Sequence, residues 1–227
     1  MSPRPRTVAD STILEAAVTV LGRIGPERLT LADVGEEAGL SAATLVQRFG
    51  SKRDLMLSVF KFTSVGFETR LQTAIDTNDS PLEAIFAAAM DRPGIPGEPE
   101  ATSNMFAFFL SDLRDPAFRN IAQENARSAV DGFKNLLDQA VEQGELAESY
   151  VDTAQLAETI YSLTIGTLMR WSIFGEGSYR TLIRGELDVL LRPFRRGPRK
   201  ALSTPPREMS GDRSGMKLSA APSPAGV

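Results

Sequence analysis

A short segment in the first quarter of the chain, SAATLVQRFGSKR, combines side chains that can read DNA bases with cations that can bind phosphates. It contains Thr44 and Gln47, the three cations Arg48, Lys52 and Arg53, and no acidic residue. Gln can form a bidentate pair with adenine, and the methyl groups of Thr or Val can touch the thymine methyl. Lys and Arg bind phosphates without reading sequence. These residue types indicate nucleic-acid recognition rather than catalysis.

The segment belongs to a longer stretch, residues 29–55, whose pattern predicts three short helices separated by two tight breaks. Thr30, Ser41 and Ser51 can each cap the start of a helix, and Gly39 can end the first one. Apolar residues at helical spacing would pack the first two helices together as a helix-turn-helix: Leu31, Val34, Ala38, Leu40, Leu45 and Phe49. A solvated face without DNA binding is the alternative, because such turns recur in proteins that bind no DNA.

The outward face of the second helix follows from its turn angle. A helix turns by about 100° per residue, so if Leu45 and Phe49 point inward the opposite positions face solvent. These outward residues are Ala43, Thr44, Val46 and Gln47, with Ala42 and Arg48 on the flanks. The face is slim enough to enter the major groove of DNA.

Composition excludes most catalytic and metal chemistry. The 227-residue chain has no Cys and no His, which removes disulfides, thiolate metal sites and every Ser-His or Cys-His nucleophile. No phosphate-binding or dinucleotide-binding glycine motif is found. We therefore expect no catalytic residue, no metal site and no cofactor; a hydrolase that uses carboxylates alone is a distant alternative.

Residues Ile13 to Phe60 resemble the DNA-binding domain of the TetR family of transcriptional regulators. The similarity lies in ILEAAVTVLGRIG, LTLADVGEEAGLS and ATLVQRFGSKRDLM, without a gap. The resemblance implies DNA contacts by Thr30, Thr44, Arg48 and Lys52, largely to the backbone. The chain departs from the family where Val46 replaces an aromatic residue, usually Tyr, and where Ala42 replaces Lys, Arg or Pro. The expected DNA-binding set is Thr30, Ser41, Ala42, Ala43, Thr44, Val46, Gln47, Arg48 and Lys52.

The predicted fold is all-α, with an N-terminal three-helix DNA-binding domain and a larger helical ligand-binding and dimerisation domain. We expect a basic N-terminal arm at 1–10, the helix-turn-helix domain at 11–55, the larger domain at 56–196 and a disordered basic tail at 197–227. One helix should run from Lys52 towards Pro81, a Pro- and Gly-rich loop should span 91–100, and a helix should follow from Ser103. Acids outnumber Lys and Arg by 20 to 10 in residues 61–191, whereas the two are equal, 7 each, in 1–60. An acidic body should confine DNA contact to the N-terminal domain.

The larger domain also carries an aromatic and methionine cluster that either packs as core or lines a cavity. In a TetR-like fold this region holds an effector pocket, and such a lining would suit an apolar or aromatic small molecule. Arg170, Arg114 and Asn104 are candidate polar anchors. The predicted pocket set is Phe86, Met90, Met105, Phe106, Phe109, Phe133, Met169, Arg170 and Trp171.

The last two predicted helices are apolar on more than one face, which favours burial against a second copy. Dimerisation through these helices is also what the resemblance implies. The candidate interface residues are Ile160, Leu163, Thr167, Phe174, Ile183, Leu187, Leu190 and Leu191.

The sequence thus favours a cytoplasmic, homodimeric regulator of transcription. We expect a repressor that binds a palindromic double-stranded DNA operator and leaves it when a small-molecule effector binds. The alternative is a small-molecule carrier or dimeric adaptor with the same fold and no specific DNA binding, which Val46 and Ala42 favour. No apolar run is long enough to span a membrane.

Overall fold

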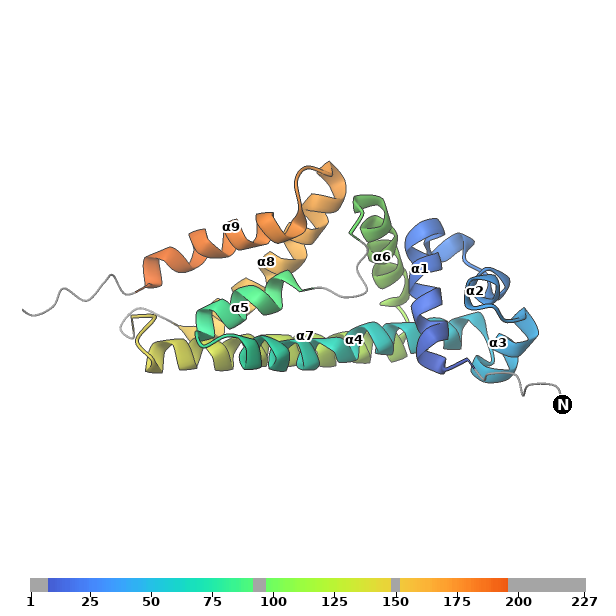
Figure 1. Ribbon diagram of the computed structural model, residues 1–227, viewed down its shortest axis with the longest axis horizontal. Coiled ribbons are helices and arrows are strands. Elements are labelled where there is room, and N and C mark those ends of the chain that lie inside the picture. The colour runs from blue at the N-terminus through green and yellow to red at the C-terminus, as the bar shows by residue number, and fades with distance from the viewer. Residues whose placement is uncertain (1–7, 92–96, 148–151, 196–227) are drawn as a thin grey trace, which may run out of the picture. The chain divides into compact units, whose positions relative to one another are not determined.

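The computed structural model describes residues 8–91, 97–147 and 152–195, with the side chains of 64–67 and 111–112 left out (Figure 1). Within these ranges the chain is helical, and its β-structure is limited to one isolated bridge between Leu146 and Arg195. The elements are α1 (Asp10–Arg28), α2 (Leu31–Ala38), α3 (Ala42–Phe49), α4 (Lys52–Thr77), α5 (Pro81–Met90), α6 (Pro99–Asp112), α7 (Pro116–Glu142), α8 (Thr153–Phe174), α9 (Tyr179–Leu191) and a 3₁₀ turn, Arg192–Phe194. The all-α fold class is confirmed. The expected tail lies outside the described residues, as does most of the N-terminal arm.

Side-chain caps mark the starts of several helices, and those predicted at Ser41 and Ser51 are confirmed. The hydroxyl groups of Ser41, Ser51 and Ser80 each accept the backbone N–H three residues later, at the starts of α3, α4 and α5. Asp115 caps α7 in the same way, through the N–H of Ala117. Proline occupies the first position of α5 and α7, where its missing N–H costs no hydrogen bond.

One helix is interrupted by a glycine, and one expected boundary differs in the structure. The regular part of α1 is interrupted at Gly25, whose φ of 77° only glycine adopts readily, and the helix resumes at Pro26. α6 starts at Pro99 rather than Ser103, so the last two residues of the predicted loop are helical. The reason is that proline favours the first helical position as well as loops. Residues 92–96 of that loop lie outside the described residues.

Two apolar cores hold the described helices together. The N-terminal core combines residues of α1 to α4, such as Val20, Val34 and Leu45, with Phe108 of α6 and Phe118 of α7. Phe60 of α4 packs edge-on against both of these rings, with centroid distances of 5.8 and 5.4 Å. The N-terminal core therefore includes residues from later helices, which the sequence analysis did not anticipate.

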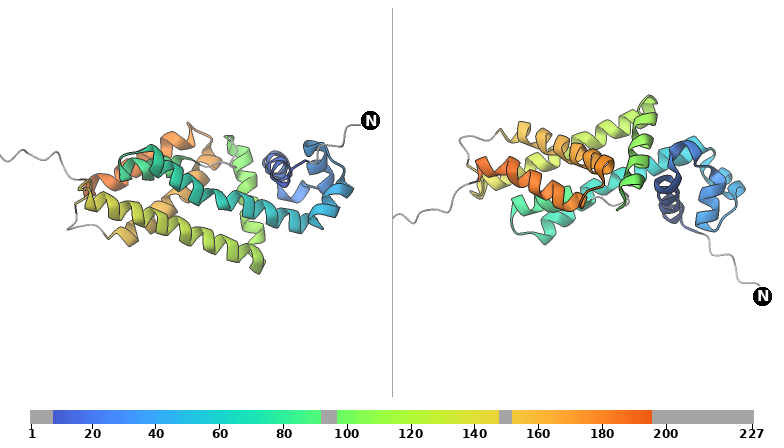
Figure 2. Two further views of the ribbon diagram at one scale, coloured as in Figure 1. Left: turned by 60° about the horizontal axis from the view of Figure 1, so that its bottom comes forward. Right: turned by 90° about the horizontal axis from the view of Figure 1, so that it is seen from above.

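The second core lies among α4, α5, α7, α8 and α9, and we call it the body core. Its largest side chains include Phe86, Phe133 and Trp171. The α4 helix contributes to both cores, with Leu55 to Phe60 in the N-terminal core and Ala74 in the body core. Figure 2 shows α4 running from the small helices α1 to α3 along the longer helices of the body. No described helix is long and apolar enough to cross a membrane.

The described residues belong to one compact unit, and the predicted boundary at residue 55 stays a prediction. Because both cores share α4, a displacement of one core can be transmitted along a continuous helix rather than through a flexible linker.

Candidate DNA-binding site

The helix-turn-helix is fixed by local hydrogen bonds at each end of α2. Thr30 and Asp33 form a capping box, in which the Thr30 hydroxyl accepts from the Asp33 N–H and the Asp33 carboxylate accepts from the Thr30 N–H at 2.8 Å. The Thr30 hydroxyl also donates to the Asp33 carboxylate at 2.6 Å, and this bond together with the one from the Thr30 N–H lowers the pKa of Asp33 below its ordinary value. Gly39 ends α2 in the left-handed conformation, with φ 67°.

The turn between α2 and α3 also needs a glycine inside α2. The Leu40 N–H donates to the Gly35 carbonyl at 2.7 Å, which brings the turn directly against the helix. A Cβ at Gly35 would lie 2.7 Å from the Leu40 carbonyl oxygen, which is a steric clash with backbone. The close approach of these two residues thus sets how α3 is held against α2.

The structure places the sequence-predicted face of α3 outward. Leu45 is fully buried, whereas Ala43, Val46 and Gln47 are exposed, Val46 to 48%. Thr44 is half-buried, and its hydroxyl lies 2.9 Å from the Ser41 hydroxyl at the helix start. Two residues able to touch bases, Val46 and Gln47, are therefore presented together on a rigid support. Their contact with DNA stays a prediction.

Arg48, by contrast, is engaged within the chain. Its guanidinium donates to the Val8 carbonyl at 2.6 Å and forms an ion pair with Asp10, at the start of α1. Only 24% of the Arg48 side chain is exposed. In this structure Arg48 anchors α3 to α1, and the expected phosphate contact would require it to share or exchange these partners.

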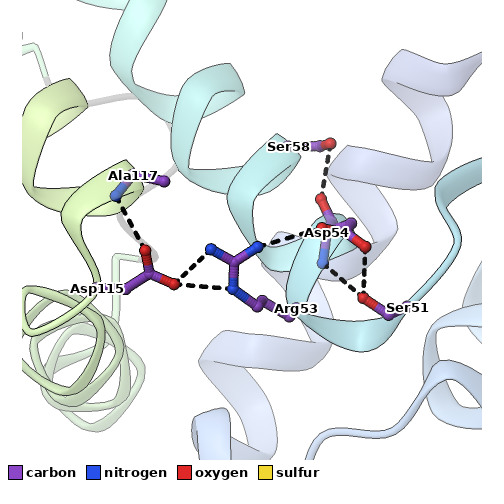
Figure 3. A network of polar contacts seen from close by, with 6 residues as sticks. All are labelled: Ser51, Arg53, Asp54, Ser58, Asp115 and Ala117. Atoms are coloured by element: carbon purple, nitrogen blue, oxygen red, sulfur yellow. Dashed lines mark hydrogen bonds and ion pairs between the residues drawn. The ribbon is translucent and has the colours of Figure 1, made fainter.

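Lys52 and Arg53, at the start of α4, are tied to other elements too. Lys52 Nζ donates to the Pro26 carbonyl at 2.8 Å. Arg53 donates from Nε and Nη2 to Oδ2 of Asp115, at 2.8 and 2.5 Å (Figure 3). Both residues thus link the helix that follows α3 to its surroundings, Lys52 to α1 and Arg53 to the start of α7.

A continuous polar network joins the start of α4 to the start of α7 (Figure 3). Ser51 and Asp54 bond to each other at the start of α4, Arg53 lies within 3.4 Å of Asp54, and Asp115 also accepts the Ala117 N–H at 2.9 Å. The Ala117 N–H and the Arg53 guanidinium lower the pKa of Asp115 below its ordinary value, and Asp115 in turn raises the pKa of Arg53. The sequence analysis did not single out Asp115 for this role; its only signal was the Asp-Pro pair at a helix start.

The predicted effector-pocket residues are divided between the two cores. Phe86, Phe133 and Trp171 belong to the body core, and Met90 and Phe106 pack against it. Met105 and Phe109 belong instead to the N-terminal core.

The remaining two pocket residues lie at the end of α8 and are exposed. Met169 is 48% exposed, and Arg170 forms an ion pair with Glu186. Among the suggested polar anchors, Asn104 donates to the Gly22 carbonyl at 2.7 Å and so ties α6 to α1. Arg114 is an exposed residue between α6 and α7.

The predicted dimer residues are mostly interior to the single chain. The five buried ones, at 0 to 2% exposure, are Ile160, Thr167, Ile183, Leu187 and Leu191. Leu163 and Leu190 are half-buried, and Phe174 is 67% exposed. These five residues are buried because the faces of α8 and α9 that carry them are turned towards the interior of the single chain.

Other residues form the exposed apolar face of α8 and α9. Ile173 is 66% exposed and Val189 is 62% exposed. Gly166 and Gly185 lie on the same two helices, and a Cβ on either would meet no atom within 4 Å. Phe174, at the end of α8, was among the predicted interface residues, whereas Ile173, Val189 and the two glycines were not.

Comparison with known proteins agrees with this geometry. A family model described as "Bacterial regulatory proteins, tetR family" matches residues 13–59, which span the helix-turn-helix and its flanking helices. Residues 13–59 therefore match the tetR-family DNA-binding domain. The chain is 24% identical, over 82% of its length and 90% of the relative's, to the HTH-type transcriptional regulator BetI of Agrobacterium fabrum.

Solved structures share the fold of this chain. The regulator FadR of Bacillus subtilis, in complex with stearoyl-CoA, superposes with a TM-score of 0.61 at 19% identity, covering 80% of this chain and 97% of FadR. SmeT of Stenotrophomonas maltophilia, in complex with triclosan, superposes with a TM-score of 0.63 at 22% identity, covering 82% and 91%. At these identities the likeness establishes the fold alone.

Proposed function

We propose that this chain is a homodimeric transcriptional repressor that binds a palindromic DNA operator. The observation that carries the proposal is the exposed face of α3, where Val46 and Gln47 project from a capped and tightly packed helix-turn-helix. Gln47 would read a base edge, and the Val46 methyls would touch thymine. Thr30, Ser41, Ala42, Ala43, Thr44, Arg48 and Lys52 complete the proposed DNA-binding set.

A dimer would supply the second recognition helix. Two-fold symmetry places equivalent helices in successive major grooves when they lie about 34 to 36 Å apart, and it makes the operator palindromic. We propose that the partner packs on the exposed face of α8 and α9, where Ile173, Phe174 and Val189 offer apolar surface. Gly166 and Gly185 would permit close approach of the two copies.

An apolar or aromatic small molecule is the proposed effector. Support comes from the aromatic side chains Phe86, Phe133 and Trp171 in the body core, with Met90 and Phe106 beside them. The solved structures of FadR and SmeT are complexes with stearoyl-CoA and with triclosan, respectively. Release from the operator requires that the effector bind the free conformation more tightly than the DNA-bound one.

The test is a titration of the protein with the duplex upstream of its own gene, at two salt concentrations. A repressor should bind with a dissociation constant of about 10⁻⁸ M or tighter, and about 10³-fold more tightly than it binds a scrambled duplex. Equal, weak binding to both duplexes that disappears with salt would contradict the proposal.

A carrier or adaptor without specific DNA binding is the second candidate. It is favoured by Val46 and by the engagement of all three nearby cations, Arg48, Lys52 and Arg53, within the chain. The same titration separates the two candidates, because a carrier would show no preference for the upstream duplex. Neither candidate involves an enzymatic activity.

A further inference from the structure

A half-open cavity of about 750 Å³ lies apart from the aromatic residues proposed for the effector, and it shares only the candidate anchor Asn104 with the residues named for the effector. Its walls come from the end of α1, the start of α4, α6 and the first turn of α7. This volume is within the range typical of small-molecule sites. The cavity therefore opens between the helices that carry α3 and the helices of the body.

The lining of this cavity holds more cations than carboxylates. It includes four cations, Arg23, Arg28, Lys52 and Arg53, and two carboxylates, Glu27 and Glu100, in a chain whose net charge is −4. Arg23 and Arg53 are paired with Glu37 and Asp115 outside the lining, so the attraction for an anion comes from Arg28 and Lys52.

Two of these cations, Lys52 and Arg28, have N–H groups left to donate hydrogen bonds to a ligand. Lys52 Nζ makes one hydrogen bond, to the Pro26 carbonyl, and Arg28 uses its Nε for the Ile24 carbonyl. In the described ranges neither cation lies within 4.0 Å of a carboxylate, whereas Arg23 pairs with Glu37 and Arg53 with Asp115. The ammonium of Lys52 and the terminal nitrogens of the Arg28 guanidinium can therefore donate to a bound anion.

The rest of the lining is apolar or amide. Phe108 and Phe118 contribute buried aromatic side chains to the lining of the cavity. Ala107 is an exposed lining residue, and Asn104 adds an amide. An inorganic anion would leave most of the volume empty. An organic anion with a ring or short chain would place its charge near Arg28 and Lys52 and its apolar part against Ala107.

We propose that this cavity is a second ligand site, specific for a small organic phosphate or carboxylate. A ligand held there would contact α1 and α4 on one side and α6 and α7 on the other, and would favour the arrangement in which these helices are together. That regulatory consequence rests on the proposed function; the binding itself does not.

The test uses 1-naphthyl phosphate and its uncharged counterpart 1-naphthol as probes of the full-length protein, by calorimetry without DNA. We expect one molecule of 1-naphthyl phosphate per chain, bound at least about tenfold more tightly than 1-naphthol. Arg28→Gln and Lys52→Gln should each weaken binding of the phosphate about tenfold. Arg127→Gln, an exposed position of α7 outside the cavity, is the matched control and should leave binding unchanged.

A filling variant separates the cavity from general attraction of anions. Ala107→Trp keeps every charge and should abolish binding, provided that circular dichroism shows unchanged helix content. Absent binding of the phosphate, equal binding of 1-naphthol, an equal loss in Arg127→Gln or full binding in Ala107→Trp would each overturn the proposal. Since no step measures operator binding, failure here leaves the repressor proposal intact.

Discussion

Arg53 and Asp115 join the start of α4 to the start of α7 through two hydrogen bonds to a single carboxylate oxygen. The residues are 62 positions apart in the chain. Arg53 lies four residues after the end of α3, and Asp115 caps the start of α7. The pair is a direct polar link between the DNA-binding helices and α7.

This link predicts how stability depends on pH. The pKa of Asp115 is lowered in the folded chain, so its stabilising effect is fully present above the unfolded value, about 3.9, and is lost as pH falls through the lower folded value. Asp115→Asn keeps a side chain that can cap α7 but cannot ionise. Urea unfolding between about pH 6 and pH 3 should show a shallower loss of stability for this variant than for the native chain.

Arg53→Gln is the matched variant for the same measurement. It leaves Asp115 and its cap in place and removes the guanidinium that helps to lower the pKa of Asp115. The loss of stability between about pH 6 and pH 3 should therefore be shallower for this variant too. If the native chain and both variants lose stability in parallel, the ion pair contributes nothing and the prediction is wrong.

Gly35→Ala should destabilise the helix-turn-helix. The added Cβ would lie 2.7 Å from the Leu40 carbonyl oxygen, so the turn must move away from α2. Steric misfits of this kind cost about 1 to 3 kcal/mol, which thermal unfolding would detect. Gly97→Ala is the control, because a Cβ there meets no atom within 4 Å. A Gly35 variant as stable as the control would show that the turn tolerates the shift.

Val46→Tyr should strengthen DNA binding. The resemblance to the family places a Tyr hydroxyl on a phosphate at this position, and Val46 is exposed enough to accept the larger side chain. One added hydrogen bond to a charged group is worth about 1.5 to 3 kcal/mol, or roughly 10- to 150-fold in affinity. Val46→Phe lacks only the hydroxyl and should gain much less. Equal gains in a filter-binding assay would assign the effect to ring contacts.

Gln47→Ala should change base discrimination only, whereas Arg48→Ala should change both DNA affinity and thermal stability. Gln47 is exposed and should lose about 1 to 3 kcal/mol of discrimination at one base pair, with unchanged thermal stability. Arg48 holds the Val8 carbonyl and Asp10, so its removal should lower the melting temperature as well as the affinity. Parallel melting and binding measurements decide the matter; a fully stable Arg48 variant would contradict the anchoring role.

Ile173→Arg should weaken the proposed dimer. It puts a charge on the exposed apolar face of α8, and loss of a buried isoleucine alone should raise the dissociation constant at least about tenfold. Leu110→Arg is the control, since Leu110 is 61% exposed on α6. Sedimentation velocity over a range of concentrations measures both. Equal behaviour of the two variants would place the interface elsewhere.

Local signals account for what the sequence predicted well. The caps at Thr30, Ser41, Ser51 and Asp115 and the turn at Gly39 depend on residues within four positions of each other. They can be found without knowing the tertiary structure. The outward face of α3 follows from helical periodicity in the same way.

What the sequence missed depends on contacts between distant segments. Phe108 and Phe118 pack on α4 in the N-terminal core, a contact that periodicity along their own helices does not reveal. Arg48, Lys52 and Arg53 read as free cations, yet their partners lie 26 to 62 positions away. On α8 and α9, the positions that face solvent could be separated from those facing the body only once the packing was known.

The shared N-terminal core has a consequence for anyone dissecting this protein. A fragment ending near Phe60 would lack Met105, Phe108 and Phe118 and would leave the inner side of α4 uncovered. Such a fragment should aggregate or unfold rather than behave as an independent DNA-binding domain. Transfer of this domain to another regulator would require that α6 and the first turn of α7 be transferred as well.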